Sequence, residues 1–196
     1  VRFVNMGARG IGGCCGTSPD HIRDLARSIK PLVKSAFSVK TLELGKEAPL
    51  KDPVPSREKS GFAAKLADKQ WVATVEILPP RGFSLEQTIE KAKQCKEAGV
   101  DAMNIPDGPR ASSRMSPMIT AYRIQHEAGI ETVLHFCCRD RNLIGMQSDL
   151  LGCASVGIVN LLFITGDPPK LGDYPFASAV FDADSIGMVK IQANLN

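Results

Sequence analysis

Three glycines spaced about 30 residues apart constrain the fold of this chain more than any other feature. Gly99, Gly129 and Gly157 each follow an amphipathic stretch and precede a short apolar run, at intervals of 30 and 28 residues. Glycine ends helices in the left-handed conformation, and a short apolar run is typical of a strand buried on both faces. A unit that repeats in this way indicates parallel strands with helices outside.

The apolar runs predict four strands, near residues 71–78, 102–106, 132–137 and 159–165. Ser84 and Ser116 stand where helix N-caps are expected, and Pro117 suits a first helical position. A final helix is expected to begin around Asp184. Four such βα units are half of a (βα)8 TIM barrel, so we predict an α/β fold with a partial barrel. A doubly wound open sheet has the same periodicity and stays open as an alternative.

A region of different composition precedes the repeats. Ser18 opens a predicted helix that runs to about Lys30, and glycines lead into Cys14-Cys15 as in a short strand. Residues 38–60 are rich in Lys, Glu, Pro and Ser without an apolar period, which is typical of a linker. We therefore predict three parts: a strand and helix, a linker and the partial barrel, over residues 1–34, 35–65 and 66–196.

Charge and hydropathy argue against several classes of protein. The 24 Lys and Arg are spread along the chain and the formal net charge is +3, which argues against nucleic-acid binding. No apolar run is long enough to cross a bilayer, and no signal segment opens the sequence. We expect a cytoplasmic protein with reduced cysteines. Because Val1 is not an initiator methionine and the last residues continue a helical pattern, we expect a segment of a longer chain.

Ligands of parallel βα folds bind beyond the carboxyl ends of the strands, so polar residues there are candidate site residues. Glu76 alternates with Val75 and Ile77 and therefore faces the interior of a closed barrel, where burial would make it a proton donor. A buried carboxylate paired with Arg or Lys is an equal alternative. Taken alone, His135 is more often a core residue and Asp167 a turn residue.

The paired cysteines Cys14 and Cys15 lie between glycines at the end of the first predicted strand. Catalytic zinc needs three protein ligands and an open position, whereas an adjacent cysteine pair alone is more often buried packing. The surrounding string, however, resembles the last-strand motif of the zinc-dependent homocysteine S-methyltransferases: Gly-Gly-Cys-Cys-Gly-Thr-Ser-Pro-Asp-His-Ile at residues 12–22. The resemblance implies that residues 1–34 are the C-terminal end of a homocysteine S-methyltransferase domain, the last βα unit of another barrel. It also implies that Cys14 and Cys15 bind Zn2+ with a third cysteine and that homocysteine is the substrate.

The strand-end motifs together resemble methylenetetrahydrofolate reductase over roughly residues 66–196. They are Val-Glu-Ile-Leu-Pro-Pro at 75–80, His135, and Gly-Asp-Pro-Pro at 166–169. The resemblance implies a TIM barrel that holds FAD, takes hydride from NAD(P)H and reduces methylenetetrahydrofolate to methyltetrahydrofolate. Glu76 then matches the general acid. Asp167 matches an aspartate beside flavin and folate, whose charge stabilises a cationic intermediate.

The resemblance also implies which residues bind the cofactor: His135, Thr165, Gly166, Asp167, Phe181 and Asp182. There are two departures from the family pattern, because Pro106-Asp107 replaces a Thr- and Gly-containing strand end and Thr165 replaces an arginine. The chain is similar to bacterial proteins that fuse a homocysteine methyltransferase ahead of the reductase. Two alternatives stay open: a zinc methyltransferase as the main identity, or an inactive fragment that forms a homo-oligomer through open strand edges.

Overall fold

The computed structural model describes residues 2–5, 11–13, 16–29 and 54–195, which fall into two compact units, Val1–Pro49 and Leu50–Asn196. The first unit contains α1 (Arg2–Asn5) and α2 (Pro19–Ile29). The helix predicted after Ser18 is thus confirmed. The Nδ1 atom of His21 accepts a hydrogen bond from the Ser18 backbone N–H at 3.0 Å, so this histidine belongs to the start of the helix.

The second unit alternates helices and strands in the order that the sequence predicts. Its elements are α3 (Ser56–Lys59), α4 (Gly61–Ala67), β1 (Thr74–Glu76), α5 (Glu86–Glu97), β2 (Ala102–Ile105), α6 (Pro117–Glu127), β3 (Glu131–Cys137), α7 (Leu143–Ser155), β4 (Asn160–Ile164) and α8 (Ser185–Leu195). All four predicted strands and the final helix are confirmed. The predicted linker extended too far, because α3 and most of α4 lie within residues 35–65.

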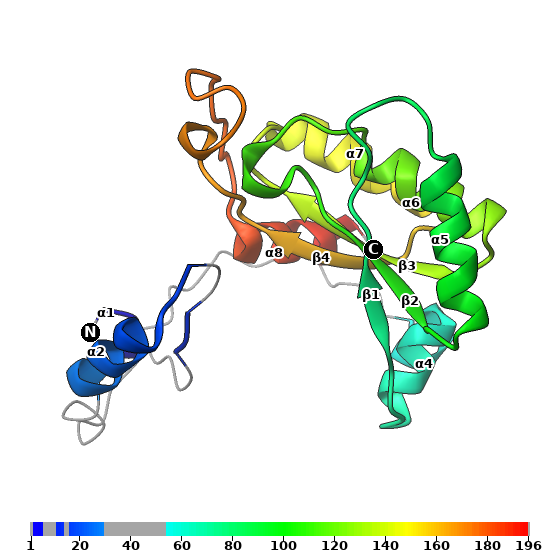
Figure 1. The fold of residues 1–196 in the computed structure, drawn as a ribbon, viewed down its shortest axis with the longest axis horizontal. Helices are drawn as coiled ribbons and strands as arrows, with labels where there is room; N and C mark the ends of the chain where they lie inside the picture. The colour runs from blue at the N-terminus through cyan, green and yellow to red at the C-terminus, as the bar shows by residue number, and fades with distance from the viewer. Residues whose placement is uncertain (1, 6–10, 14–15, 30–53, 196) are drawn as a thin grey trace. The chain divides into compact units, whose positions relative to one another are not determined.

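The four strands form one parallel sheet in the order β1-β2-β3-β4 (Figure 1). Glu76 pairs with Asn104 across β1 and β2, and His135 pairs with Leu162 across β3 and β4. A doubly wound sheet reverses its strand order at a switch point. The sequential order observed here is that of successive strands in a barrel, so the open-sheet alternative is wrong.

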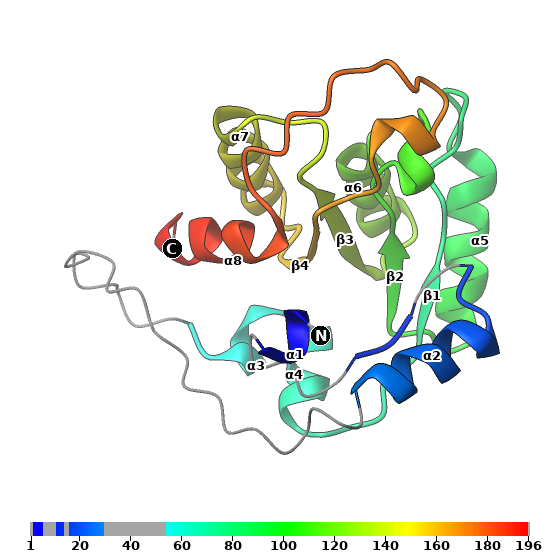
Figure 2. The same ribbon diagram turned by 90° about the vertical axis from the view of Figure 1, so that its left-hand side faces the viewer.

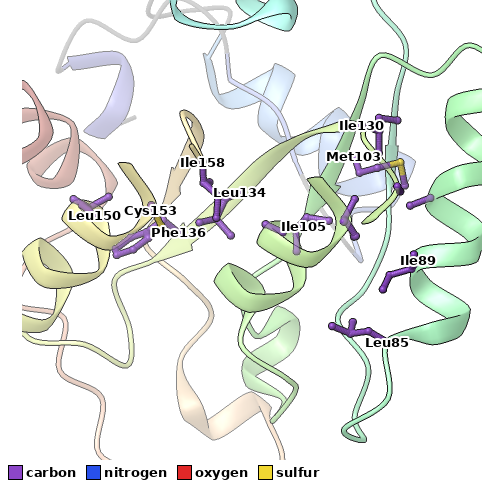
Figure 3. Packing of buried hydrophobic residues seen from close by; sticks show 14 of the residues in the cluster. Leu85, Ile89, Met103, Ile105, Ile130, Leu134, Phe136, Leu150, Cys153 and Ile158 are labelled. Carbon is purple, nitrogen blue, oxygen red and sulfur yellow. The ribbon is translucent and has the colours of Figure 1, made fainter. Parts of the chain in front are cut away.

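One face of the sheet is covered by helices and carries the hydrophobic core. Alternate residues of the strands, such as Met103, Leu134 and Phe136, are buried against α5, α6 and α7 (Figure 3). The rings of Phe136 and Phe163 meet edge to face, with their centroids 5.9 Å apart. This pattern follows from the strand period of two, which sends neighbouring side chains to opposite faces.

The opposite face carries polar side chains and is largely uncovered. Glu76 is exposed, whereas Asn104 and His135 are partly buried. The predicted burial of Glu76 is therefore not observed, because no described element of this unit packs over that face. None of the described helices is both long and apolar enough to span a membrane.

The amino ends of the strands are held by α4, which lies beyond them in both views (Figures 1 and 2). The carboxylate of Glu131 accepts hydrogen bonds from the backbone N–H groups of Gly61 at 2.8 Å and Phe62 at 3.1 Å. Asn160 donates to the same carboxylate at 3.1 Å and accepts from the Ser60 hydroxyl at 2.7 Å. A carboxylate at a helix N-terminus is favourable because it meets unpaired N–H groups.

Candidate active site

Glu76, Asn104 and His135 form a polar row across the first three strands. Glu76 and Asn104 are register partners, and the Nε2 atom of His135 lies 3.2 Å from Oδ1 of Asn104. This contact is a hydrogen bond when Nε2 carries the hydrogen and donates to the amide oxygen. The parallel register therefore brings together Glu76 and His135, two of the predicted site residues, on one face of the sheet.

Burial lowers the pKa of His135 below its ordinary value, and the negative charges of Glu76 and Asp107 oppose that shift without cancelling it. The imidazole is therefore predominantly neutral near neutral pH. A neutral ring can donate one hydrogen bond and accept another.

Asp167 lies in the loop after β4 and is exposed. Its Oδ2 atom accepts a hydrogen bond from the backbone N–H of Arg110 at 2.9 Å, which ties this loop to the one after β2. The carboxylate therefore stands at the carboxyl edge of the sheet, the same edge toward which β1 presents Glu76. That edge is where a barrel binds its ligand.

Asp107 is buried, and its carboxylate binds other residues of the protein. Its Oδ2 atom accepts the Cys137 backbone N–H at 3.0 Å and the Arg141 guanidinium at 2.7 Å. Arg141 also donates to Asp149 at 2.8 Å and lies 5.0 Å from the centre of the Phe136 ring. Burial acts to lower the pKa of Arg141, but the two aspartates outweigh it and the net shift is upward. Asp107 thus stabilises the ends of β2 and β3.

Thr165 and Gly166 shape the turn at the end of β4. The Thr165 hydroxyl accepts the Ser185 backbone N–H at 3.1 Å and so fixes the start of α8. Gly166 has a φ of +97°, and a Cβ added there would lie 2.3 Å from Sγ of Cys137. Only glycine fits this position without displacing its neighbours.

Phe181 and Asp182 belong to the segment that leads into α8. Phe181 has a positive φ of 48°, and Oδ2 of Asp182 accepts the Leu143 backbone N–H at 3.2 Å, at the start of α7. The structure therefore gives Asp182 a helix-capping contact. No contact recorded in the described part of the chain joins this pair to Glu76 or His135.

Two cavities of about 300 Å³ each open beside the loops after β2, β3 and β4. Both are lined by Asp107, Gly108 and Arg139, and one of them also by Gly166 and Asp167. Neither is lined by Glu76 or His135, so the polar row lies outside both. Sequence reasoning missed Arg139 and Arg141, although two arginines directly after a buried strand end were a usable signal.

The described cysteines are thiols. Burial raises the pKa of both Cys137 and Cys138, for Cys138 to about 11, which disfavours the thiolate that a metal requires. In the described ranges, no three residues of metal-binding type are grouped to hold an ion. Cys14 and Cys15 lie outside the described residues, so the zinc site stays a prediction.

Barrel enzymes bind their ligands at the carboxyl ends of parallel strands. A parallel βα sheet with polar side chains at that edge is typical of this class. The family model for methylenetetrahydrofolate reductase matches residues 62–191, and the chain belongs to this family, whose domain is a TIM barrel. Residues 1–29 match the family model for homocysteine S-methyltransferase. Together the two matches support methylenetetrahydrofolate reduction and homocysteine methylation as the general chemistry.

Proposed function

We propose that residues 62–191 contribute to an FAD-dependent reductase that uses NAD(P)H to convert methylenetetrahydrofolate into methyltetrahydrofolate. The observation that carries the proposal is the polar row of Glu76, Asn104 and His135, with Asp167 on an adjoining loop. These groups are an acid, a neutral hydrogen-bonding ring and a negative charge at one edge of the sheet. Folate and homocysteine are then the small-molecule substrates of a cytoplasmic protein.

Glu76 is assigned the role of general acid. It donates a proton to a nitrogen of the five-membered ring that bridges the folate, and the bond from that nitrogen to the methylene carbon breaks. The methylene group becomes an iminium cation, which is ready to accept hydride. FAD, when bound, would supply that hydride, and NAD(P)H would be the source of the hydride that reduces the flavin. The exposed position of Glu76 leaves its carboxyl group accessible to a substrate.

Asp167 and His135 suit a cationic intermediate for different reasons. Asp167 places a negative charge at the carboxyl edge, which stabilises a developing positive charge. His135 is kept neutral by its lowered pKa, so it adds no second positive charge beside the iminium. Its hydrogen bond to Asn104 fixes the orientation of the ring.

The residues assigned to FAD fit an extended cofactor at this edge. The turns at Gly108 and Gly166 both have positive φ, and both cavities beside them are lined by Asp107, Gly108 and Arg139. We assign the cofactor to His135, Thr165, Gly166, Asp167, Phe181 and Asp182. The side chains of Thr165 and Asp182 already accept backbone N–H groups, so their expected role is to hold the surrounding loops in shape.

The match over residues 1–29 favours a second activity in the same protein, which is zinc-dependent methyl transfer to homocysteine. In this proposal Cys14 and Cys15 bind Zn2+ with a third cysteine. Bound zinc would lower the pKa of the homocysteine thiol, and the resulting thiolate would form a bond to the methyl carbon as the bond from that carbon to the donor breaks and leaves its electron pair on the donor. Zinc analysis of the full-length protein tests it: Cys14→Ser and Cys15→Ser should each lose bound zinc, whereas Cys95→Ser should retain it.

Reconstitution of the full-length protein with FAD tests the reductase. We expect a flavin absorbance band, oxidation of NADH or NADPH with menadione as acceptor, and reduction of methylenetetrahydrofolate. A protein that takes up no added FAD would contradict the proposal. A protein that binds FAD and oxidises the nicotinamide but never reduces the folate would limit it to a flavin oxidoreductase.

A further inference from the structure

Arg139 occupies a buried position between two loops at the carboxyl edge of the sheet. It follows β3, is 4% exposed, and its Nη1 atom donates to the backbone carbonyl of Gly108 at 3.3 Å and to that of Asp167 at 3.2 Å. One guanidinium from the third strand therefore links the loops that follow the second and the fourth. A planar group with several donors suits such a bridge, because each N–H has a fixed direction.

The turns on both sides of Arg139 are glycines, and the structure shows why. A Cβ added to Gly108 would lie 2.6 Å from Nη2 of Arg139, and one added to Gly166 would lie 3.2 Å from the Cβ of Arg139. Both glycines also have positive φ. The guanidinium of Arg139 thus fills the space that a side chain at residue 108 would need, whereas at residue 166 Sγ of Cys137, at 2.3 Å, is nearer than Arg139.

The positive charge of Arg139 is balanced by the carboxylate of Asp140, not by that of Asp167. Its Nε and Nη2 atoms donate to the two carboxylate oxygens of Asp140 at 2.8 and 2.7 Å, and this pairing raises the pKa of Arg139. Its contact with Asp167 is through the main-chain carbonyl, not the carboxylate. Asp167 therefore keeps its own negative charge available to a ligand.

Asp167 is held at two points by this arrangement. Arg139 fixes its backbone carbonyl, and the Arg110 N–H fixes Oδ2 of its side chain at 2.9 Å. Arg110 itself lies two residues after Gly108, the other residue that Arg139 holds. One guanidinium thus positions both the aspartate and the loop that orients its carboxylate.

We propose that Arg139 is a positioning residue for folate reduction, which sets the carboxylate of Asp167 where the cationic intermediate forms. This inference rests on the proposed function. It does not require Arg139 to contact folate or flavin. A displaced carboxylate would still be charged but would stabilise the cation poorly, because electrostatic stabilisation depends on a fixed geometry.

The test compares Arg139→Gln, Arg139→Lys and, as a second buried arginine, Arg141→Gln, all in the full-length protein. The backbone amides of Gly108, Arg110, Gly166 and Asp167 should exchange hydrogen faster in Arg139→Gln. In Arg141→Gln, the amides of Gly166 and Asp167 should exchange as in wild type. The kcat for folate reduction should fall about 10- to 100-fold in Arg139→Gln with little change in KM. Oxidation of the nicotinamide with menadione should fall by a clearly smaller factor, because that reaction forms no cation beside Asp167, and lysine should restore part of the folate activity.

Different results would overturn different steps. Unchanged exchange at the amides of Gly166 and Asp167 in Arg139→Gln would show that the guanidinium does not fix Asp167. Equal losses of folate reduction and menadione reduction would show a general structural role instead of a positioning one. If the wild-type protein takes up no FAD, the reductase proposal itself fails, and the exchange data alone then decide whether Arg139 holds the two loops.

Discussion

The two ends of the parallel sheet use similar polar groups in opposite ways. At the amino end, both oxygens of Glu131 accept hydrogen bonds from the first turn of α4, and Asn160 adds another. At the carboxyl end, Glu76 and Asp167 are exposed and accessible to a ligand, while Asp107 and Arg139 are buried and hydrogen-bonded within the protein. Carboxylates thus stabilise the fold at the amino end of the sheet, whereas at the carboxyl end two of them are accessible to a ligand.

This difference predicts a division of roles. A residue whose polar atoms are all satisfied by the protein stabilises the fold, whereas a residue held in place but left accessible is available for chemistry. In barrels the carboxyl end carries the catalytic residues and the amino end contributes stability. Substitutions at the carboxyl end should therefore change activity, and substitutions at the amino end should change the free energy of unfolding. Each substitution below tests this assignment.

The largest effect is expected for Glu76→Gln, at the carboxyl end. Glutamine keeps the size of the side chain but cannot donate the proton, so folate reduction should fall by about 10²- to 10⁴-fold. Flavin binding and menadione reduction should persist. The measurement is the rate of methyltetrahydrofolate formation beside the rate of nicotinamide oxidation with menadione, in the same preparation.

The control for Glu76→Gln is Glu90→Gln, the same chemical change at an exposed position of α5. It should leave both rates unchanged. If Glu76→Gln still reduces folate at nearly the wild-type rate, the acid lies elsewhere and the polar row is not the catalytic centre.

The second effect is expected for Gly166→Ala. The new methyl group would meet Sγ of Cys137 at 2.3 Å, and alanine is disfavoured at a φ of +97°. We expect a loss of about 2–3 kcal/mol in the free energy of unfolding, together with weaker FAD binding. Urea unfolding and flavin fluorescence titration measure the two losses.

A second substitution separates the two causes of that loss. Cys137→Ala removes the sulfur, so the double variant should regain the part of the stability that the steric contact had cost. The part that comes from the positive φ should remain. Full recovery in the double variant would show that the backbone conformation at Gly166 imposes no cost.

Much of this fold could be predicted because its signals are local. The glycines at 99, 129 and 157 end helices with positive φ, and the apolar runs after them became strands at nearly the expected residues. The strand order could not be read from periodicity, since parallel open sheets and barrels repeat in the same way. It required the pairing of β1 with β2 and of β2 with β3.

The site was predicted less completely, for a physical reason. Alternation placed Glu76 on the face away from Val75, and the register then brought it beside Asn104 and His135. Arg139 donates hydrogen bonds to the main-chain carbonyls of residues 108 and 167, and nothing in a sequence records such contacts. Whether the assigned residues bind FAD stays a prediction.

The third effect tests the amino end through Glu131→Gln. One carboxylate oxygen becomes an NH2 group that faces a backbone N–H of α4, so a hydrogen bond and the favourable charge at the helix terminus are lost. We expect the free energy of unfolding to fall by about 1–2 kcal/mol, with folate and menadione rates unchanged per folded molecule. Glu127→Gln, which removes an exposed pair with Arg123, should leave the free energy of unfolding nearly unchanged. A loss of activity in Glu131→Gln would break the division between the two ends.

The smallest effect concerns the pH dependence of stability at His135. Because burial lowers its pKa in the folded state, the unfolded chain binds a proton more readily. The free energy of unfolding therefore has its full value above the ordinary histidine pKa of about 6.5. It decreases as the pH falls from there toward the lower pKa of the folded state. His135→Gln removes this dependence, so the variant should lose less stability than wild type between about pH 7.5 and pH 5.5. Urea unfolding at both pH values measures the difference.

Equal losses of stability in the two proteins would show that His135 takes up its proton as easily in the folded state as in the unfolded chain. The argument for a neutral ring beside the cation would then fail.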